Sequence, residues 1–170
     1  ISEKFGVSVA TLIQNAGRVV AEELAKRAKP SDGLILLFAG KGNNGGDAKI
    51  AAAELEKKGY TCKLVSAGEV IASVGEAIPK TVWIIDGILG TGIAGKVRDW
   101  PAEAIAFLNQ SGKKILSIDI PSGLSTDKGV PFGNAVKADV TVCLGGVKLG
   151  CFLHPGCEVA GEVVNREIGI

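Results

Sequence analysis

The feature that most restricts how this sequence can fold is a glycine-rich segment at residues 40–47, Gly-Lys-Gly-Asn-Asn-Gly-Gly-Asp. It follows an apolar run at residues 34–39 and leads into a helical pattern at residues 48–58. A glycine-rich turn between a strand and a helix lets backbone N–H groups converge on an anion at the helix N-terminus. Glycine also allows a ligand to approach the backbone closely. The segment therefore predicts a phosphate site, to which two asparagines and an aspartate add side-chain oxygens.

The rest of the chain alternates apolar, strand-like runs with helical patterns. Three helices are expected, at residues 9–28, 48–58 and 99–110, with a short helix or turn at 70–77. Strands are expected at residues 34–39, 60–66, 81–86, 114–120 and 139–144, with a final edge strand at 162–168. Near-continuous apolar strands separated by helices predict a mostly parallel sheet that is covered on both faces. Ligands of such sheets bind beyond the carboxyl ends of the strands.

Length and charge limit the alternatives. A chain of 170 residues suits one domain with a full core. A net charge of +1 gives no reason to expect nucleic acid as a partner, and no apolar run approaches the ~20 residues of a membrane span. No signal peptide is visible, and because the sequence contains no methionine we expect it to be a fragment or a processed form.

Two further acidic residues follow predicted strands and should lie at the same sheet edge. Asp86 begins a glycine-rich loop at residues 86–96, which suggests a ligand clamp or a hard-cation site, or else a simple turn cap. Asp119 begins the segment Asp-Ile-Pro-Ser-Gly, where a partly buried carboxylate could act as a general acid or base. The hydroxyl of Ser122 could supply an oxygen ligand beside Asp86. Crowding acids at one edge costs energy unless a cation or ligand is present, and this favours a functional site.

Several other features are less specific. The pattern Gly40-x-Gly42-x-x-Gly45 matches a dinucleotide fingerprint, but the acid that should follow the second strand for the ribose is absent. Cys151, His154 and Cys157 have a spacing that could suggest zinc, although no fourth ligand is visible. The remaining cysteines fall in predicted strands, as expected of small buried residues. Four thiols without a disulfide framework fit a reducing compartment.

The motifs together resemble the YjeF N-terminal domain family, the NAD(P)H-hydrate epimerases. The resemblance covers essentially the whole chain and rests on residues 12–17, 42–47, 86–92, 118–123, 138–148 and 167–170. It implies a Rossmann-like three-layer α/β/α sandwich formed by a single domain at residues 1–170. The additional N-terminal helix of the family is missing ahead of Ile1.

The resemblance also implies an activity, namely interconversion of the R and S forms of hydrated NADH and NADPH (NAD(P)HX), which repairs damaged cofactor. It implies a potassium ion held by Asn44, Asp86 and Ser122, with Asp119 as our choice for the acid–base group. Lys148, in the loop after the fifth strand, could reach a substrate phosphate. The residues expected to contact the substrate are Asn43, Asn44, Gly45, Gly46, Asp47, Gly90, Thr91, Gly92, Ile93, Ala94, Gly95, Lys96, Asp119 and Lys148.

The resemblance also implies partners and a location, and this sequence differs from the family pattern at a few positions. It implies a fused or separate NAD(P)H-hydrate dehydratase that consumes the S epimer, a homodimer and a cytoplasmic location, or an organellar one if a targeting segment was removed. Ala48 and Lys49 differ from the usual family sequence, as do Ile13 and Gln14. The alternatives are a non-catalytic nucleotide-binding or scaffold module on the same fold and, less well supported, one half of an NAD dehydrogenase.

Overall fold

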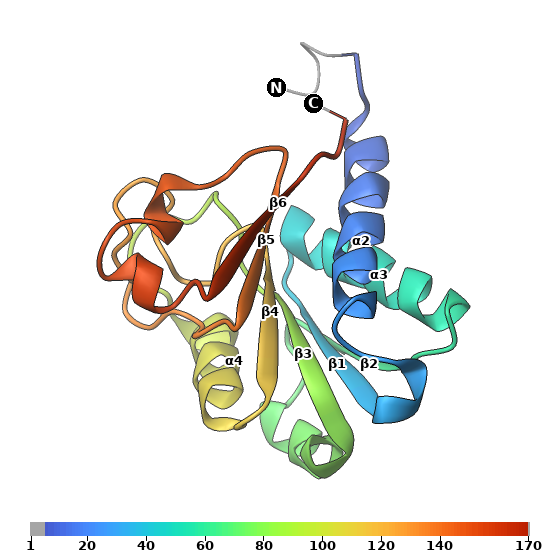
Figure 1. Ribbon diagram of the computed structural model, residues 1–170. Coiled ribbons are helices and arrows are strands. Elements are labelled where there is room, and N and C mark those ends of the chain that lie inside the picture. The colour runs from blue at the N-terminus through green and yellow to red at the C-terminus, as the bar shows by residue number, and fades with distance from the viewer. Residues whose placement is uncertain (1–5, 170) are drawn as a thin grey trace.

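The protein, described here from a computed structural model over residues 6–169, contains one six-stranded sheet with helices on both faces (Figure 1). Every strand pair is parallel, and the strand order is β2-β1-β3-β4-β5-β6. The strands are β1 (Leu34–Ala39), β2 (Thr61–Ser66), β3 (Thr81–Gly87), β4 (Lys114–Ile118), β5 (Val140–Leu144) and β6 (Glu162–Arg166). The predicted α/β class and the predicted final edge strand are confirmed, although β6 ends at Arg166 and not at residue 168.

The helices form two outer layers. Helices α2 (Val9–Ala25) and α3 (Asn43–Lys57) cover one face, while α4 (Asp99–Gln110) and the 3-10 segment η2 (Ile71–Lys80) cover the other (Figure 1). Successive residues of a strand point to opposite faces, so Leu37 of β1 packs with α2 and α3 while Phe38 packs with α4. The remaining 3-10 segments are η1 (Pro30–Asp32), η3 (Leu149–Cys151) and η4 (Gly156–Glu158). The three-layer α/β/α arrangement is thereby confirmed.

The strand order determines where a ligand can bind. The chain leaves β1 toward β2 on one side, whereas β3 and all later strands lie on the other side. In doubly wound sheets this reversal opens a crevice beyond the carboxyl ends of the two strands where it occurs. The crevice therefore lies between the end of β1 and the end of β3, where the two glycine-rich segments are found.

The largest difference from the sequence-based prediction concerns the second helix, which begins at Asn43 and not at Ala48. Gly42 is its N-cap, and its carbonyl accepts the N–H groups of Gly45 and Gly46 at 3.1 and 3.2 Å. Glycine has a low helix propensity, which made the segment look like a loop. Glycine is needed at position 45 for packing, because a Cβ there would overlap the carbonyl oxygen of Gly40.

Other boundaries shift less. The first helix ends at Ala25 instead of residue 28, and its N-cap is Ser8, whose hydroxyl accepts the N–H of Thr11 at 3.1 Å. Helix α4 begins at Asp99 as predicted, and its N-cap residue, Arg98, makes no side-chain capping hydrogen bond. Strand β4 ends at Ile118, two residues before the prediction, because the next residue turns out of the sheet. The expectations that concern Ile1 and Ile170 lie outside the described residues.

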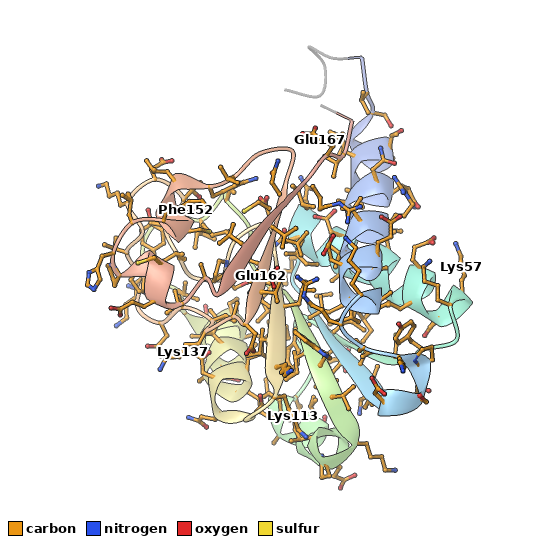
Figure 2. The ribbon with its side chains drawn as sticks, viewed as in Figure 1. Lys57, Lys113, Lys137, Phe152, Glu162 and Glu167 are labelled. Carbon is orange, nitrogen blue, oxygen red and sulfur yellow. The ribbon has the colours of Figure 1, made fainter. Side chains whose placement is uncertain are left out.

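Helix α2 is attached to the edge strand by an ion-pair network. Glu23, which is 2% exposed, accepts from Lys26, Arg27 and Arg166. Arg27 also donates to Glu162, which Figure 2 labels on β6, at 2.9 Å. These contacts hold α2 beside β6, so that the beginning of α2 reaches the carboxyl edge of the sheet.

Candidate functional site

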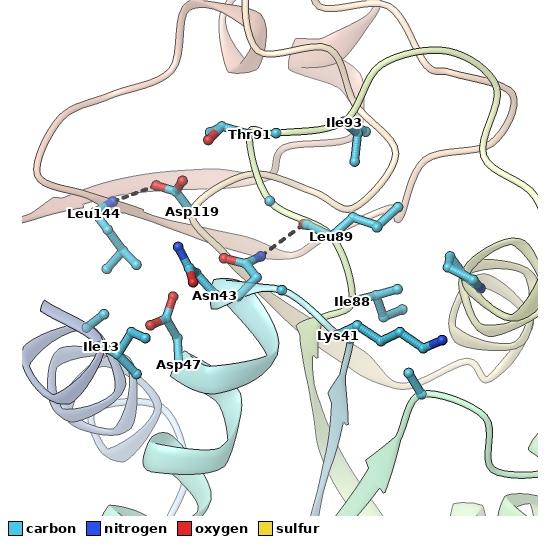
Figure 3. Close-up of a pocket in the computed structure, with 18 of the residues that line it drawn as sticks. Ile13, Lys41, Asn43, Asp47, Ile88, Leu89, Thr91, Ile93, Asp119 and Leu144 are labelled. Carbon is cyan, nitrogen blue, oxygen red and sulfur yellow. Dashed lines mark hydrogen bonds between the residues drawn. The ribbon is translucent and has the colours of Figure 1, made fainter. Parts of the chain in front are cut away.

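A pocket of about 940 Å³ lies at the carboxyl edge of the sheet, at the predicted crevice (Figure 3). Its floor comes from the β1–α3 turn, residues 40–44, and one wall comes from the loop after β3, residues 88–93. The beginning of α2 contributes apolar side chains, including Ile13. The ends of β4 and β5 complete it with Asp119 and Leu144. A cavity of this size is in the upper range for small-molecule sites.

The first turn of α3 lies at the floor of the pocket. The N–H groups at the start of a helix have no intrahelical acceptor, and the helix dipole is positive there. Asn43 and Asn44 occupy this turn and line the pocket. The phosphate site expected from the glycine-rich segment thus corresponds to a helix N-terminus that opens into a cavity.

Asp119 is held in one orientation at the end of β4. Its backbone has a φ of 69°, which is unusual for a residue other than glycine, and its N–H donates to Val142 at 2.8 Å. Its Oδ1 accepts the N–H of Leu144 at 3.1 Å and lies 2.5 Å from the Nζ of Lys148. That ammonium also donates to the carbonyls of Leu144 and Gly146. The carboxylate is therefore tied to the end of β5 while it faces the pocket.

Asp47 is a second carboxyl group in the same pocket, but its surroundings differ. Its side chain is only 6% exposed and makes no hydrogen bond within residues 6–169. Figure 3 shows the carboxyl groups of Asp47 and Asp119 reaching the pocket from two different elements. Burial, together with the negative charge of Asp119, raises the pKa of Asp47 to about 7. Asp47 can therefore carry a proton near neutral pH.

A third carboxyl group, Asp86, lies behind the pocket wall and is fully buried. Its Oδ1 accepts from the Ser122 hydroxyl at 2.5 Å and from the Ile88 N–H at 3.2 Å. Its Oδ2 accepts from the Ser117 hydroxyl at 2.7 Å and from the Ser122 N–H at 2.9 Å. Burial raises the pKa of Asp86, and these hydrogen bonds oppose the rise. Asp86 therefore organises the loop ends around it.

Asn44 connects the helix to the same cluster. Its Nδ2 donates to the carbonyl oxygens of Leu89 and Ile118, each at 2.9 Å. The N–H of Leu89 in turn donates to the Ser122 hydroxyl at 2.8 Å. The expected ligand residues are thus brought together from three separate segments of the chain. The amide nitrogen of Asn44 and the hydroxyl of Ser122 both donate to the carbonyl of Leu89, and Ser122 also donates to Asp86.

The residues predicted to contact substrate fall into two groups. The first group lines the pocket and comprises Asn43, Asn44, Asp47, Gly90, Thr91, Gly92, Ile93 and Asp119. The second group does not contribute to the pocket lining and comprises Gly45, Gly46, Ala94, Gly95, Lys96 and Lys148. Gly45 is packed against the backbone of Gly40. The ammonium of Lys148 is paired with Asp119 and does not project into the pocket.

The structure also places residues in the pocket that the sequence reasoning did not single out. Lys41 lines it, and Figure 3 shows this side chain extending toward α4. Trp100, in the first turn of α4, lines it as well and donates from Nε1 to the carbonyl of Glu69 at 2.9 Å. Lys41 lies inside the glycine-rich segment, so its position was a usable signal. Trp100 could be found only by noting that α4 begins at the same sheet edge.

Two weaker motifs gain no support. Cys151 is buried while Cys157 is exposed, and His154 pairs with Glu158 at 2.9 Å. Within residues 6–169 there is no group of three or more His, Cys, Asp or Glu side chains that could hold a metal ion. Glu69, the first acid after β2, accepts the N–H of Ser66 at 2.7 Å and does not line the pocket, which argues against a ribose-binding acid.

No helix within the described residues is both long and apolar enough to cross a bilayer.

Comparison with known proteins gives consistent matches. Residues 9–77 and 67–150 match the family described as YjeF-related protein N-terminus. A bifunctional NAD(P)H-hydrate repair enzyme of Archaeoglobus fulgidus is 37% identical over 186 residues, which cover 99% of this chain and 39% of that protein. The chain therefore spans about two-fifths of the length of that relative.

Relatives of similar length to this chain carry a narrower name. Proteins named NAD(P)H-hydrate epimerase from Cenarchaeum symbiosum and Clavibacter michiganensis are each 34% identical. The matches cover 94% and 90% of this chain, and 84% and 81% of those proteins. The crystal structure of a yeast protein has the same fold, with a TM-score of 0.77 at 21% identity, covering 96% of this chain and 80% of that one.

Proposed function

Because the chain belongs to the family of YjeF-related N-terminal domains, we propose that it interconverts the R and S forms of hydrated NADH and NADPH. The observation that carries this proposal is the shared pocket, in which the N-terminus of α3 and the carboxyl groups of Asp47 and Asp119 come together. An anion site beside proton-transfer groups suits a phosphate-bearing substrate that reacts at a hydroxyl-bearing carbon.

The dinucleotide would be held mainly by backbone groups. Its phosphates are proposed to bind at the start of α3, where residues 43–47 supply N–H groups and amide side chains. The loop at residues 90–96 would close over the substrate from the β3 side. Lys148 remains a candidate phosphate contact, although its present position favours a role at Asp119.

The chemistry concerns C6 of the hydrated nicotinamide ring, which carries a hydroxyl next to the ring nitrogen. Inversion requires either loss and return of the hydroxyl or opening and closure of the ring, and both routes need proton transfer. Asp119 is the proposed acid–base group because it faces the pocket in a fixed orientation. A positioned acid–base group contributes on the order of 10²–10⁴ in rate.

The oxygen cluster beside the pocket fits a monovalent cation. Asn44, Asp86 and Ser122 carry amide, carboxylate and hydroxyl oxygens, with a single formal charge and no imidazole or thiol among them, although in this structure Asn44 contacts the cluster through its amide nitrogen. Such a set suits a hard ion better than zinc or copper. We propose that these residues hold potassium, which when bound would add positive charge near the substrate phosphates. Asp86 and Ser122 also fix the loop ends through the hydrogen bonds described above.

The proposed partners follow from the same assignment. An NAD(P)H-hydrate dehydratase, on the same chain or a separate one, would consume the S epimer, which accords with the bifunctional NAD(P)H-hydrate repair enzymes among the relatives. A homodimer and a cytoplasmic location are proposed as well. The free thiols of all four cysteines accord with a reducing compartment.

The test is a coupled assay. The protein is incubated with R-NADHX, an S-specific dehydratase and its nucleotide co-substrate, and recovery of NADH absorbance is followed. Recovery well above the spontaneous rate is expected. If NADH recovers only at the spontaneous rate while a dinucleotide still binds the pocket, the scaffold alternative replaces the epimerase assignment.

A further inference from the structure

We propose that Asp47 is a second proton-transfer residue of the pocket and acts on the substrate hydroxyl from the side opposite to Asp119. The inference rests on the proposed function and assigns that site a two-carboxyl mechanism. It gives Asp47 a chemical role in addition to the binding contact expected from the sequence.

The two carboxyl groups differ in what restrains them. Asp119 is bonded to Leu144 and paired with Lys148. Asp47 is buried at 6% exposure, aims into the cavity and has no hydrogen-bond partner within residues 6–169 (Figure 3). Among the described residues no buried side-chain oxygen lacks a hydrogen-bond partner, so the unbonded carboxyl oxygens of Asp47 are open to the pocket. A ligand in the pocket can therefore reach them and exchange a proton with them.

The groups that face Asp47 explain which form it takes. Helix α2 presents the apolar Ile13 to this part of the pocket, and Ala16 of the same helix also lines the pocket. From the end of β4 comes the carboxylate of Asp119, whose Oδ1 is paired with the ammonium of Lys148. Within α3 itself the neighbouring polar side chain is the uncharged amide of Asn43. No cation therefore pairs with Asp47, and burial with the charge of Asp119 raises its pKa to about 7.

Two carboxyl groups in different environments suit an inversion, because one can act as the acid while the other acts as the base. In one direction Asp47 donates its proton to the C6 hydroxyl, the C6–O bond breaks, and water leaves as the ring nitrogen forms a double bond to C6. Asp119 removes a proton from a second water, whose oxygen bonds to C6 from the other side while the electrons return to the ring nitrogen. The opposite direction exchanges the two roles. Before a further turnover in the same direction, Asp119 releases its proton to water and Asp47 takes one up from water. Water is the sole co-reactant, and no oxidation takes place.

The variant test compares Asp47→Asn with Asp127→Asn, which removes an exposed carboxylate outside the pocket. We expect Asp47→Asn to lower kcat at least about a hundredfold, with NADPH affinity within a few-fold of wild type. We expect Asp127→Asn to match wild type. In the direction that uses the acid form of Asp47, wild-type kcat should fall about tenfold per pH unit above pH ~7, and this limb should vanish in Asp47→Asn.

A merely structural role for Asp47 gives a different result. Loss of activity in parallel with loss of NADPH binding, with the pH limb retained, would overturn the proposal, and so would near wild-type turnover of Asp47→Asn. A wild-type protein without activity above the spontaneous rate would overturn the proposed function itself, and this inference with it.

A second measurement needs no variant. In water enriched in ¹⁸O, every inversion by this route places one solvent oxygen on C6. Mass spectrometry of the product epimer should therefore show one labelled oxygen per turnover after subtraction of spontaneous exchange. Epimerisation that retains the original oxygen would overturn the two-carboxyl scheme.

Discussion

The ammonium of Lys148 lies 2.5 Å from Oδ1 of Asp119, and both side chains are 15% exposed. Lys148 is itself anchored to the carbonyls of Leu144 and Gly146, at 2.9 and 2.8 Å. The loop after β5 thus supplies a fixed positive charge that orients the carboxylate at the end of β4. Asp47, which shares the pocket, has no comparable restraint within the described residues.

Removal of that restraint should impair turnover more than binding. We expect Lys148→Met to lower kcat at least about tenfold while KM changes by less, because a misoriented proton-transfer group affects the transition state more than the bound substrate. Lys128→Met, which changes an exposed lysine outside the pocket, serves as the matched control. An increase in KM at constant kcat would instead identify Lys148 as a substrate phosphate contact.

Replacement of Asp119 should have the larger effect. We expect Asp119→Asn to bind NADPH within a few-fold of wild type but to epimerise at least about a hundredfold more slowly, since the amide cannot exchange a proton. Isothermal titration with NADPH and the coupled assay together measure the two effects. Turnover near the wild-type rate would reduce Asp119 to a positioning residue.

Asp47 should make the stability of the protein dependent on pH. Its pKa is about 7 in the folded state and near the usual 3.8 in the unfolded chain. Both states are protonated below pH ~4, and between pH ~4 and ~7 only the unfolded state releases its proton, so stability is lost as the pH rises. The loss has an upper bound on the order of 4 kcal/mol.

The variant Asp47→Asn lacks this titration. Urea unfolding at pH 4 and pH 8 should show that the variant gains stability relative to wild type at the higher pH. An equal difference in the free energy of unfolding at both pH values would contradict the assigned environment of Asp47.

Potassium should stabilise the folded protein by mass action. We expect the melting temperature to rise as potassium chloride is added at constant ionic strength, with tetramethylammonium chloride as the balancing salt. Asp86→Ala should abolish the increase, although it also destabilises the fold, because the hydroxyls of Ser117 and Ser122 lose their acceptor. A melting temperature of the wild-type protein that does not respond to potassium would count against the site.

Much of the fold was accessible from the sequence because its patterns are local. The apolar runs located β1 and β3 closely, and the glycine spacing pointed to the correct edge of the sheet. The helical nature of residues 43–47 was not accessible, because glycine argues locally for a turn. The close approach of Gly45 to the carbonyl of Gly40 depends on the folded backbone and cannot be inferred from local sequence preferences. Gly17 is similar, since a Cβ at this position would overlap the side chain of Ile50 in α3, a contact that the local sequence does not reveal.

The site was predictable in composition but not in its internal contacts. Asp86, Asp119 and Ser122 could be grouped because parallel strands end at one edge. The pairing of Asp119 with Lys148 joins two loops that are separated along the chain, and no spacing rule predicts it. The distinct environment of Asp47 depends on burial by α2, a helix whose position at this edge is determined by its contacts with α3 and β6.

The most direct test of the central claim starts from a single pure epimer. Chromatographic separation follows the R and S forms of NADPHX over time after the protein is added to the R form, beside a buffer blank and Asp119→Asn. We expect the wild-type protein to bring the two forms to their equilibrium ratio at least about a hundredfold faster than the variant. A wild-type time course that coincides with the buffer blank would contradict the epimerase assignment.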